Sequence, residues 1–314
     1  MALLMPERAL EERARGERLA VAGKLADACF SLAWAMLSLK AAGRDMEAAE
    51  AGLSLAWAQG LDGRTWQAAR TLQDVISYPA FASLSRGFRA RGYLLFAWAL
   101  WDLGEYSLSR QQAQLSYLTS ERQADRGRAS LALGQVLLYF GETESAEASF
   151  AEAVQCEPTL KATAFSVKSY LHNLAGRHAK ALVEAQAGLD TAHNAALENY
   201  DITNRAVERS ALMVEQGTAK AFLEHPDAWD TLIEAQALLD SLPFDTQLES
   251  ARVRRAMGLV LAKAGEHHAA LALLEEAFRV FRRRSVRPEY DLTVRAMSRI
   301  HKKRGARGND KAPA

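Results

Sequence analysis

Every apolar segment of this 314-residue chain follows helical spacing, so the sequence predicts helices throughout and no sheet. Successive apolar runs are each followed by a glycine. These glycines are Gly43, Gly104, Gly141, Gly176, Gly217 and Gly265. Glycine suits a short turn between antiparallel helices, because it adopts a left-handed backbone conformation without steric cost. The pattern therefore predicts a series of helix hairpins.

The residues around each glycine repeat as well as the glycine itself. Seven residues before the turn the side chain is nearly always small, and four residues before it the side chain is mostly large and apolar. Five residues after the turn a small residue recurs, as Ala146 does after Gly141. Small residues on facing positions let the two helices of a hairpin approach closely, while the large ones fill the space beside them.

One stretch carries this pattern best, residues 127–160, GRASLALGQVLLYFGETESAEASFAEAVQCEPTL. It combines Gly134, Gly141, Ala146 and a closing Pro158 within one helix-turn-helix unit. The stretch resembles a tetratricopeptide repeat. Weaker copies of the same pattern lie at 29–62, 90–123, 162–195 and 251–284. The resemblance implies an all-α, right-handed superhelical solenoid of antiparallel helix pairs.

The rest of the chain is placed around these copies. We expect a helical extension over 1–28, a repeat array over 29–284, a basic capping helix over 285–304 and a disordered tail over 305–314. A degenerate copy at 63–89 is interrupted by Pro79. Another at 203–241 is irregular, because a loop at His225, Pro226 and Asp227 separates its helices.

Composition narrows the class of protein. Apolar residues make up 49% of the chain, which excludes a disordered protein. The amino terminus mixes acids and bases without a long apolar core, and the apolar runs are too short to span a membrane, so we expect a cytoplasmic protein that does not enter the membrane. The two cysteines, Cys29 and Cys156, lie far apart and are expected to be free.

Catalytic signatures are missing from the sequence. We find no phosphate-binding glycine loop, no zinc-protease motif and no nucleophile elbow. His267 and His268 point about 100° apart on a helix, which makes a poor metal pair. The sequence therefore predicts a protein that is not an enzyme and that holds no cofactor and no metal.

The expected binding surface follows from the resemblance. In tetratricopeptide repeat proteins the first helix of each pair lines a concave groove. Matching the copies to that register gives these groove residues: Arg91, Leu94, Trp98, Trp101, Arg128, Leu131, Gln135, Tyr139, Ser166, Tyr170 and Asn173, followed by Asn204, Arg252, Arg255 and Lys263. Arginines beside aromatic residues commonly anchor binding surfaces. The alternative is that the aromatic residues only pack between successive units.

The last part of the chain is basic, since the segment from Arg279 to Arg307 holds eleven Lys and Arg against two acids. Such a segment can neutralise phosphates, contact the acidic body of another copy, or form a solvated face. We therefore expect a non-catalytic scaffold, adaptor or regulatory protein that binds a partner protein or peptide in its groove and is able to form homo-oligomers. The alternative is a nucleic-acid-binding regulator that uses its basic end.

Overall fold

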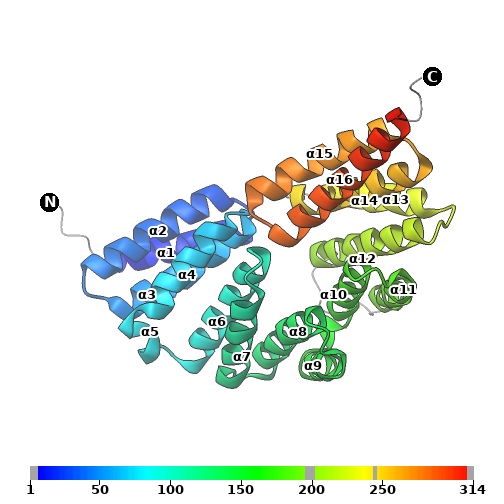
Figure 1. The fold of residues 1–314 in the computed structure, drawn as a ribbon. Coiled ribbons are helices and arrows are strands. Elements are labelled where there is room, and N and C mark those ends of the chain that lie inside the picture. The colour runs from blue at the N-terminus through cyan, green and yellow to red at the C-terminus, as the bar shows by residue number, and fades with distance from the viewer. Residues whose placement is uncertain (1–5, 195–201, 243–245, 310–314) are drawn as a thin grey trace. The chain divides into compact units, whose positions relative to one another are not determined.

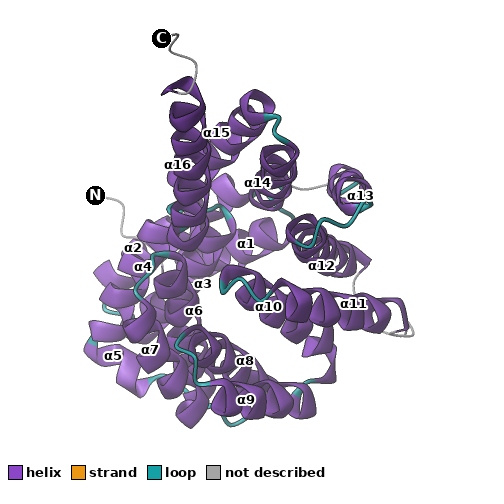
Figure 2. Cartoon of the chain, turned by 45° about the vertical axis from the view of Figure 1, so that its right-hand side comes forward, coloured by secondary structure: helices purple, strands orange, loops and turns teal. Residues whose placement is uncertain are grey.

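The computed structural model describes residues 6–194, 202–242 and 246–309. These residues form helices and loops without a strand, as Figure 2 shows, so the predicted all-α class is confirmed. The chain divides into two compact units, Met1–Glu157 and Pro158–Ala314, which are called unit 1 and unit 2.

Unit 1 is built from nine described helices (Figure 1): α1 (Pro6–Val21), α2 (Leu25–Ala41), α3 (Asp45–Leu61), α4 (Thr65–Ser77), α5 (Pro79–Ser83), α6 (Arg86–Asp102), α7 (Tyr106–Thr119), α8 (Gln123–Tyr139) and α9 (Thr143–Cys156). Consecutive helices pack on one another, for example α6 on α7 and α8 on α9. The predicted boundary between residues 28 and 29 falls inside α2. Pro79 is the first residue of α5, where its missing N–H costs nothing.

Unit 2 begins with a short 3-10 turn (Pro158–Leu160) and continues through seven helices: α10 (Lys161–Leu174), α11 (His178–Asn194), α12 (Ile202–Phe222), α13 (Ala228–Asp240), α14 (Gln247–Ala264), α15 (His267–Arg284) and α16 (Arg287–Asn309). The last helix continues to Asn309, five residues beyond the predicted capping helix. The remainder of the predicted tail, 310–314, lies outside the described residues.

The hairpin turns follow the predicted chemistry at five of the six glycines. Gly43, Gly104, Gly141, Gly176 and Gly265 all have φ between 71° and 87°, in the left-handed region. Gly217 is the exception and corrects the prediction, because it lies inside α12. A Cβ at Gly217 would lie 2.7 Å from the Leu232 side chain, so this glycine serves the close approach of α12 and α13.

Small residues bring the paired helices together, as the pattern predicts. In the best copy, a Cβ at Gly134 of α8 would lie 2.8 Å from the Phe150 ring of α9, and Ala146 is completely buried. In other hairpins a serine occupies the position of Gly134 or of Ala146, and its hydroxyl donates a hydrogen bond across the hairpin. Ser109 Oγ donates to the Ala97 carbonyl at 2.8 Å, and Ser169 Oγ donates to the Ala181 carbonyl at 2.7 Å. The hairpins are therefore closely packed without leaving these buried hydroxyls unpaired.

Candidate ligand-binding site

The first helices of unit 2 form a layer of their own. Helix α10 packs on α12, α12 on α14, and α14 on α16, while α11, α13 and α15 follow as the second helix of each pair. We call the layer made by α10, α12, α14 and α16 the inner layer. All four of its helices, with the start of α11, contribute side chains to a cavity of about 320 Å³, which is called the polar cavity.

A buried carboxyl group lies at the wall of the polar cavity. Glu215 is only 5% exposed, because α12 is buried on all sides from Leu212 to Ala219. Asn173 Nδ2 of α10 donates to the Glu215 carboxylate at 2.8 Å and to its backbone carbonyl at 2.9 Å. Burial raises the pKa of Glu215 to about 7, although the Asn173 hydrogen bond and nearby arginines favour the ionised form. The same burial raises the pKa of Tyr170 well above its ordinary value.

An ion-pair cluster joins α16 to α14 beneath the cavity. Glu289 of α16 is 1% exposed, and its carboxylate lies 2.9 Å from Arg252 Nε and 2.9 Å from Arg255 Nη2. Arg255 is itself 6% exposed and lines the polar cavity. A buried guanidinium needs a paired acid, and Glu289 supplies it from a helix 34 residues further along the chain.

The rim of the polar cavity carries further cations and an aromatic stack. The rings of His178 and Phe222 are parallel with centroids 4.0 Å apart, and the Lys263 amine lies 5.5 Å from the Phe222 ring centroid. Burial and the charge of Lys263 lower the pKa of His178, so this ring tends to be neutral. Arg295 and Arg299 of α16 complete the rim.

A second cavity of about 330 Å³ adjoins the first, and it is called the apolar cavity. The two cavities share Phe222, Leu259, Ala296 and Arg299 in their linings. Ala221, Ala262 and Ile300 extend the apolar cavity, and Lys263 and Lys302 stand at its edge. The inner layer therefore offers a polar space and an apolar space side by side.

The sequence-predicted groove residues divide between the two units. Tyr170 and Asn173 belong to unit 2, and both line the polar cavity. Arg255, also expected in the groove, lines it too, and Lys263 lies at the apolar cavity. Arg252 binds Glu289 instead, and the side chain of Asn204 lies outside the described residues.

Ser166 lies on α10 of unit 2. The other predicted residues lie on α6 and α8 of unit 1, where Leu94 and Leu131 are buried and therefore pack in the core. Trp101 is 7% exposed, and its ring contacts the rings of Tyr106 and Tyr139 edge-on, at centroid distances of 5.0 and 5.5 Å. Little of the Trp101 ring is therefore accessible. Trp98 and Tyr139 are each 39% exposed and keep free ring surface.

The polar members of this set are accessible. Arg91 is exposed, with its guanidinium 5.8 Å from the Trp57 ring centroid, and Arg128 is exposed with Nη2 3.1 Å from Glu157 Oε1. Gln135 is half-buried. That these residues share one surface with Tyr170 and Asn173 remains a prediction.

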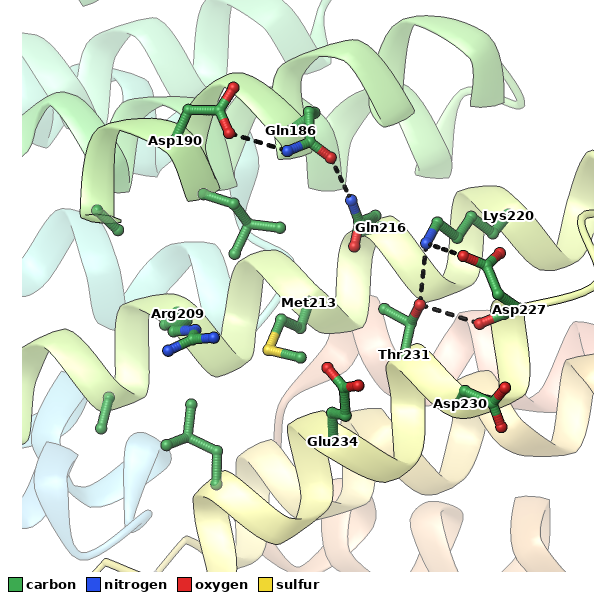
Figure 3. Close-up of a pocket in the computed structure, with 14 residues that line it drawn as sticks. Gln186, Asp190, Arg209, Met213, Gln216, Lys220, Asp227, Asp230, Thr231 and Glu234 are labelled. Atoms are coloured by element: carbon green, nitrogen blue, oxygen red, sulfur yellow. Dashed lines mark hydrogen bonds and ion pairs between the residues drawn. The ribbon is translucent and has the colours of Figure 1, made fainter. Parts of the chain in front are cut away.

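A larger hollow of about 650 Å³ lies among α11, α12 and α13, so α12 is the one inner-layer helix that lines it (Figure 3). Many of its polar side chains bind one another. Gln186 bridges Asp190 and Gln216, and Lys220 Nζ donates to Asp227 and Thr231 at 2.7 and 3.0 Å. These six side chains already make hydrogen bonds or ion pairs within the protein, which lowers the hydrogen-bonding capacity that they offer to a ligand.

Other classes of site find little support among the described residues. No group of three or more His, Cys, Asp or Glu stands close enough there to hold a metal ion. Within the same ranges no helix combines the length and apolarity needed to cross a membrane. Cys29 is buried, Cys156 is half-buried, and both are free.

Sequence reasoning missed Glu215 and Arg299. The signal for Glu215 was present, since the acid interrupts the apolar run Ala211–Val214 and is followed by the small residues Gly217 and Ala219. Because the repeat copy at 203–241 is irregular, its register could not predict which side of α12 faces the cavity. Arg299 belongs to the basic segment, whose many arginines look alike in sequence.

Comparisons with known proteins agree with this architecture. No family model matches the chain, and no curated protein matches its sequence. A tetratricopeptide repeat protein from Parabacteroides merdae ATCC 43184 aligns structurally over 92% of this chain and 99% of its own, with a TM-score of 0.56 and 11% identity. The phAimR-Ligand structure aligns over 88% of this chain and 78% of its own, with a TM-score of 0.55 and 15% identity. The chain therefore has the all-α helix-hairpin fold of tetratricopeptide repeat proteins.

Proposed function

We propose that this chain is a non-catalytic interaction protein that binds a peptide segment of a partner protein on the inner layer of unit 2. The supporting observation is the polar cavity, to which all four inner-layer helices contribute and whose wall holds the buried side chains of Glu215 and Arg255. Ligand sites are usually preformed hollows in which a few polar groups converge. The helix-hairpin fold gives such a hollow directly, because first helices from successive pairs lie side by side.

The proposal extends to unit 1 through the accessible residues of α6 and α8. Arg91, Trp98, Arg128 and Tyr139 offer accessible cationic and aromatic surface, with Arg128 paired to Glu157. Such side chains are frequent anchors in protein interfaces. We propose them as additional contacts of the same partner, outside the cavities.

Nucleic-acid binding by the basic segment gains no support from the local contacts. Arg279 Nη2 lies 3.8 Å from Glu275 Oε2, and Arg287 Nε lies 3.0 Å from Asp291 Oδ2. These two cations of the basic segment are thus paired with acids of the protein itself. We therefore do not propose this second function.

Selection of displayed peptides against the purified chain tests the proposal. A tryptophan at Ala175, which is exposed and lines the polar cavity, should fill it without disturbing the core. Ala175→Trp should weaken binding of the selected peptides at least about tenfold, or about 1.4 kcal/mol. The matched variant Ala237→Trp, at an exposed site on α13, should bind normally. Failure to enrich any peptide, or equal binding by both variants, would refute the proposal.

A further inference from the structure

The polar cavity has an excess of positive charge. Among its lining residues, Arg255, Arg295 and Arg299 face a single carboxylate, that of Glu215. Arg299 is exposed, and among the described residues it has no hydrogen bond or ion pair. Arg295 uses its Nε on a backbone carbonyl and therefore keeps its full charge.

Arg255 is the buried member of this set. Its Nη2 pairs with Glu289, but Glu289 is shared with Arg252, so one carboxylate serves two guanidinium groups. Arg255 Nε is buried and has no hydrogen-bond partner among the described residues. A buried donor without an acceptor is costly, and guanidinium groups are best satisfied by carboxylates. Arg255 Nε is therefore a buried donor that an entering acceptor can satisfy, although Glu215 and Glu289 already supply buried carboxyl groups beside it. The excess of positive charge comes from the exposed Arg295 and Arg299.

The second cavity restricts the ligand further. It lies beside the polar cavity, shares Arg299 with it, and is lined mainly by aliphatic and aromatic carbon from Phe222, Leu259 and Ile300. Lys263 and Lys302 stand at its edge. A ligand that fills both spaces must combine an acidic group with an adjacent apolar side chain.

We propose that the inner layer recognises an acidic peptide, with a ligand carboxylate placed among Arg255, Arg295 and Arg299 and an adjacent apolar side chain in the apolar cavity. This inference rests on the proposed function and names the chemistry of the peptide. A side-chain carboxylate and a C-terminal carboxylate share this chemistry.

Binding of such a peptide should be coupled to proton uptake. The titratable and charged groups around the site are Tyr170 on α10, His178 on α11, Glu215 on α12, Arg252, Arg255 and Lys263 on α14, His267 on α15, and Glu289, Arg295, Arg299 and Lys302 on α16. Because the pKa of Glu215 is raised to about 7, an entering carboxylate favours its protonated form. Protonation of His178 acts in the same direction. Affinity should therefore fall as the pH rises through neutrality.

The test uses those selected peptides whose binding is weakened by Ala175→Trp, because these peptides need the open polar cavity. Each Asp or Glu is replaced by its amide in turn, and the C-terminus is amidated in a separate peptide. Loss of the recognised carboxylate should lower affinity at least about tenfold, a value typical of a buried charge-assisted contact. The two substitutions distinguish a side-chain source from a terminal one.

Protein variants complete the experiment. Arg299→Gln, at an exposed position, should reduce the difference in affinity between the acid and amide peptides, because only Arg255 and Arg295 remain. Arg283→Gln, exposed on α15, should keep the full difference. Calorimetry in buffers of different ionisation enthalpy should detect proton uptake near neutral pH that decreases in Glu215→Gln. Peptides that need the cavity but bind equally as acids and amides would overturn this inference and leave the proposed function intact. A preference for basic peptides would also overturn it.

Discussion

Replacing Glu215 with glutamine probes the buried carboxyl group of the inner layer. Glutamine has nearly the same size, cannot ionise, and can still accept the hydrogen bond from Asn173. Burial raises the pKa of Glu215 from an ordinary value of 4.5 to about 7. The folded protein therefore holds a proton on this group over a pH range in which the unfolded chain has released it.

The sign of the pH effect follows from this difference. Between about pH 4.5 and pH 7 the folded state binds more protons than the unfolded state, so the free energy of unfolding falls as the pH rises. A shift of this size corresponds to about 3 kcal/mol in the free energy of unfolding. The wild-type protein loses this amount progressively as the pH rises to 7, and Glu215 causes no further loss above pH 7. The Glu215→Gln variant lacks this loss. Relative to wild type it should gain about 3 kcal/mol between about pH 5 and pH 8.

Urea unfolding followed by far-UV circular dichroism at several pH values measures the effect. Hydrogen exchange of the α12 amides measures the free energy of local unfolding around Glu215. This measurement is needed because helix-hairpin arrays do not always unfold in one step. Glu234→Gln is the matched control, since Glu234 is exposed on α13. Parallel pH profiles for wild type and Glu215→Gln would show that this carboxyl group is not desolvated, and the reasoning would fail.

Three further changes test the packing and the surface. Glu289→Gln should destabilise unit 2 by about 3 kcal/mol or more in urea unfolding, because it leaves buried guanidinium groups without their acid; a neutral change would contradict the buried cluster. Ala146→Phe should cost about 1 to 3 kcal/mol in thermal unfolding by overpacking α8 against α9, whereas Phe at the exposed neighbour Ser145 should cost far less. Changing Arg91 and Arg128 together to alanine should alter the free energy of unfolding by less than about 1 kcal/mol. The same change should weaken partner binding, measured by fluorescence anisotropy, at least about tenfold. Unchanged affinity would show that α6 and α8 are not part of the interface.

The fold was predictable because its signals are local. A turn glycine and the small residues around it, such as Gly134 and Ala146 around Gly141, set the geometry of a hairpin within one short stretch. The prediction failed at Gly217, where glycine serves helix packing. The true turn after α12 places Glu224, a residue without a special turn signature, at φ 61°.

The site was less predictable because its contacts join distant parts of the chain. Repeat register predicted Tyr170 and Asn173 for the groove, and both residues line the polar cavity. That they contact a partner stays a prediction. Register cannot show that Arg255 shares Glu289 with Arg252, since the partner lies on a later helix and many acids are available. The burial of Glu215 likewise depends on α10 and α14 covering α12, which only the packed structure shows.

Hydrogen-exchange footprinting of a selected peptide bound to the chain tests the central claim most directly. Binding on the inner layer predicts slower exchange in unit 2 on α10, α12, α14 and α16, with little change on α11, α13 and α15 beyond the first turn of α11. Ala175→Trp should abolish this protection and Ala237→Trp should preserve it. Protection centred on α11 and α13, at the hollow of Figure 3, would contradict the account, as would a bound peptide that leaves the inner layer unprotected.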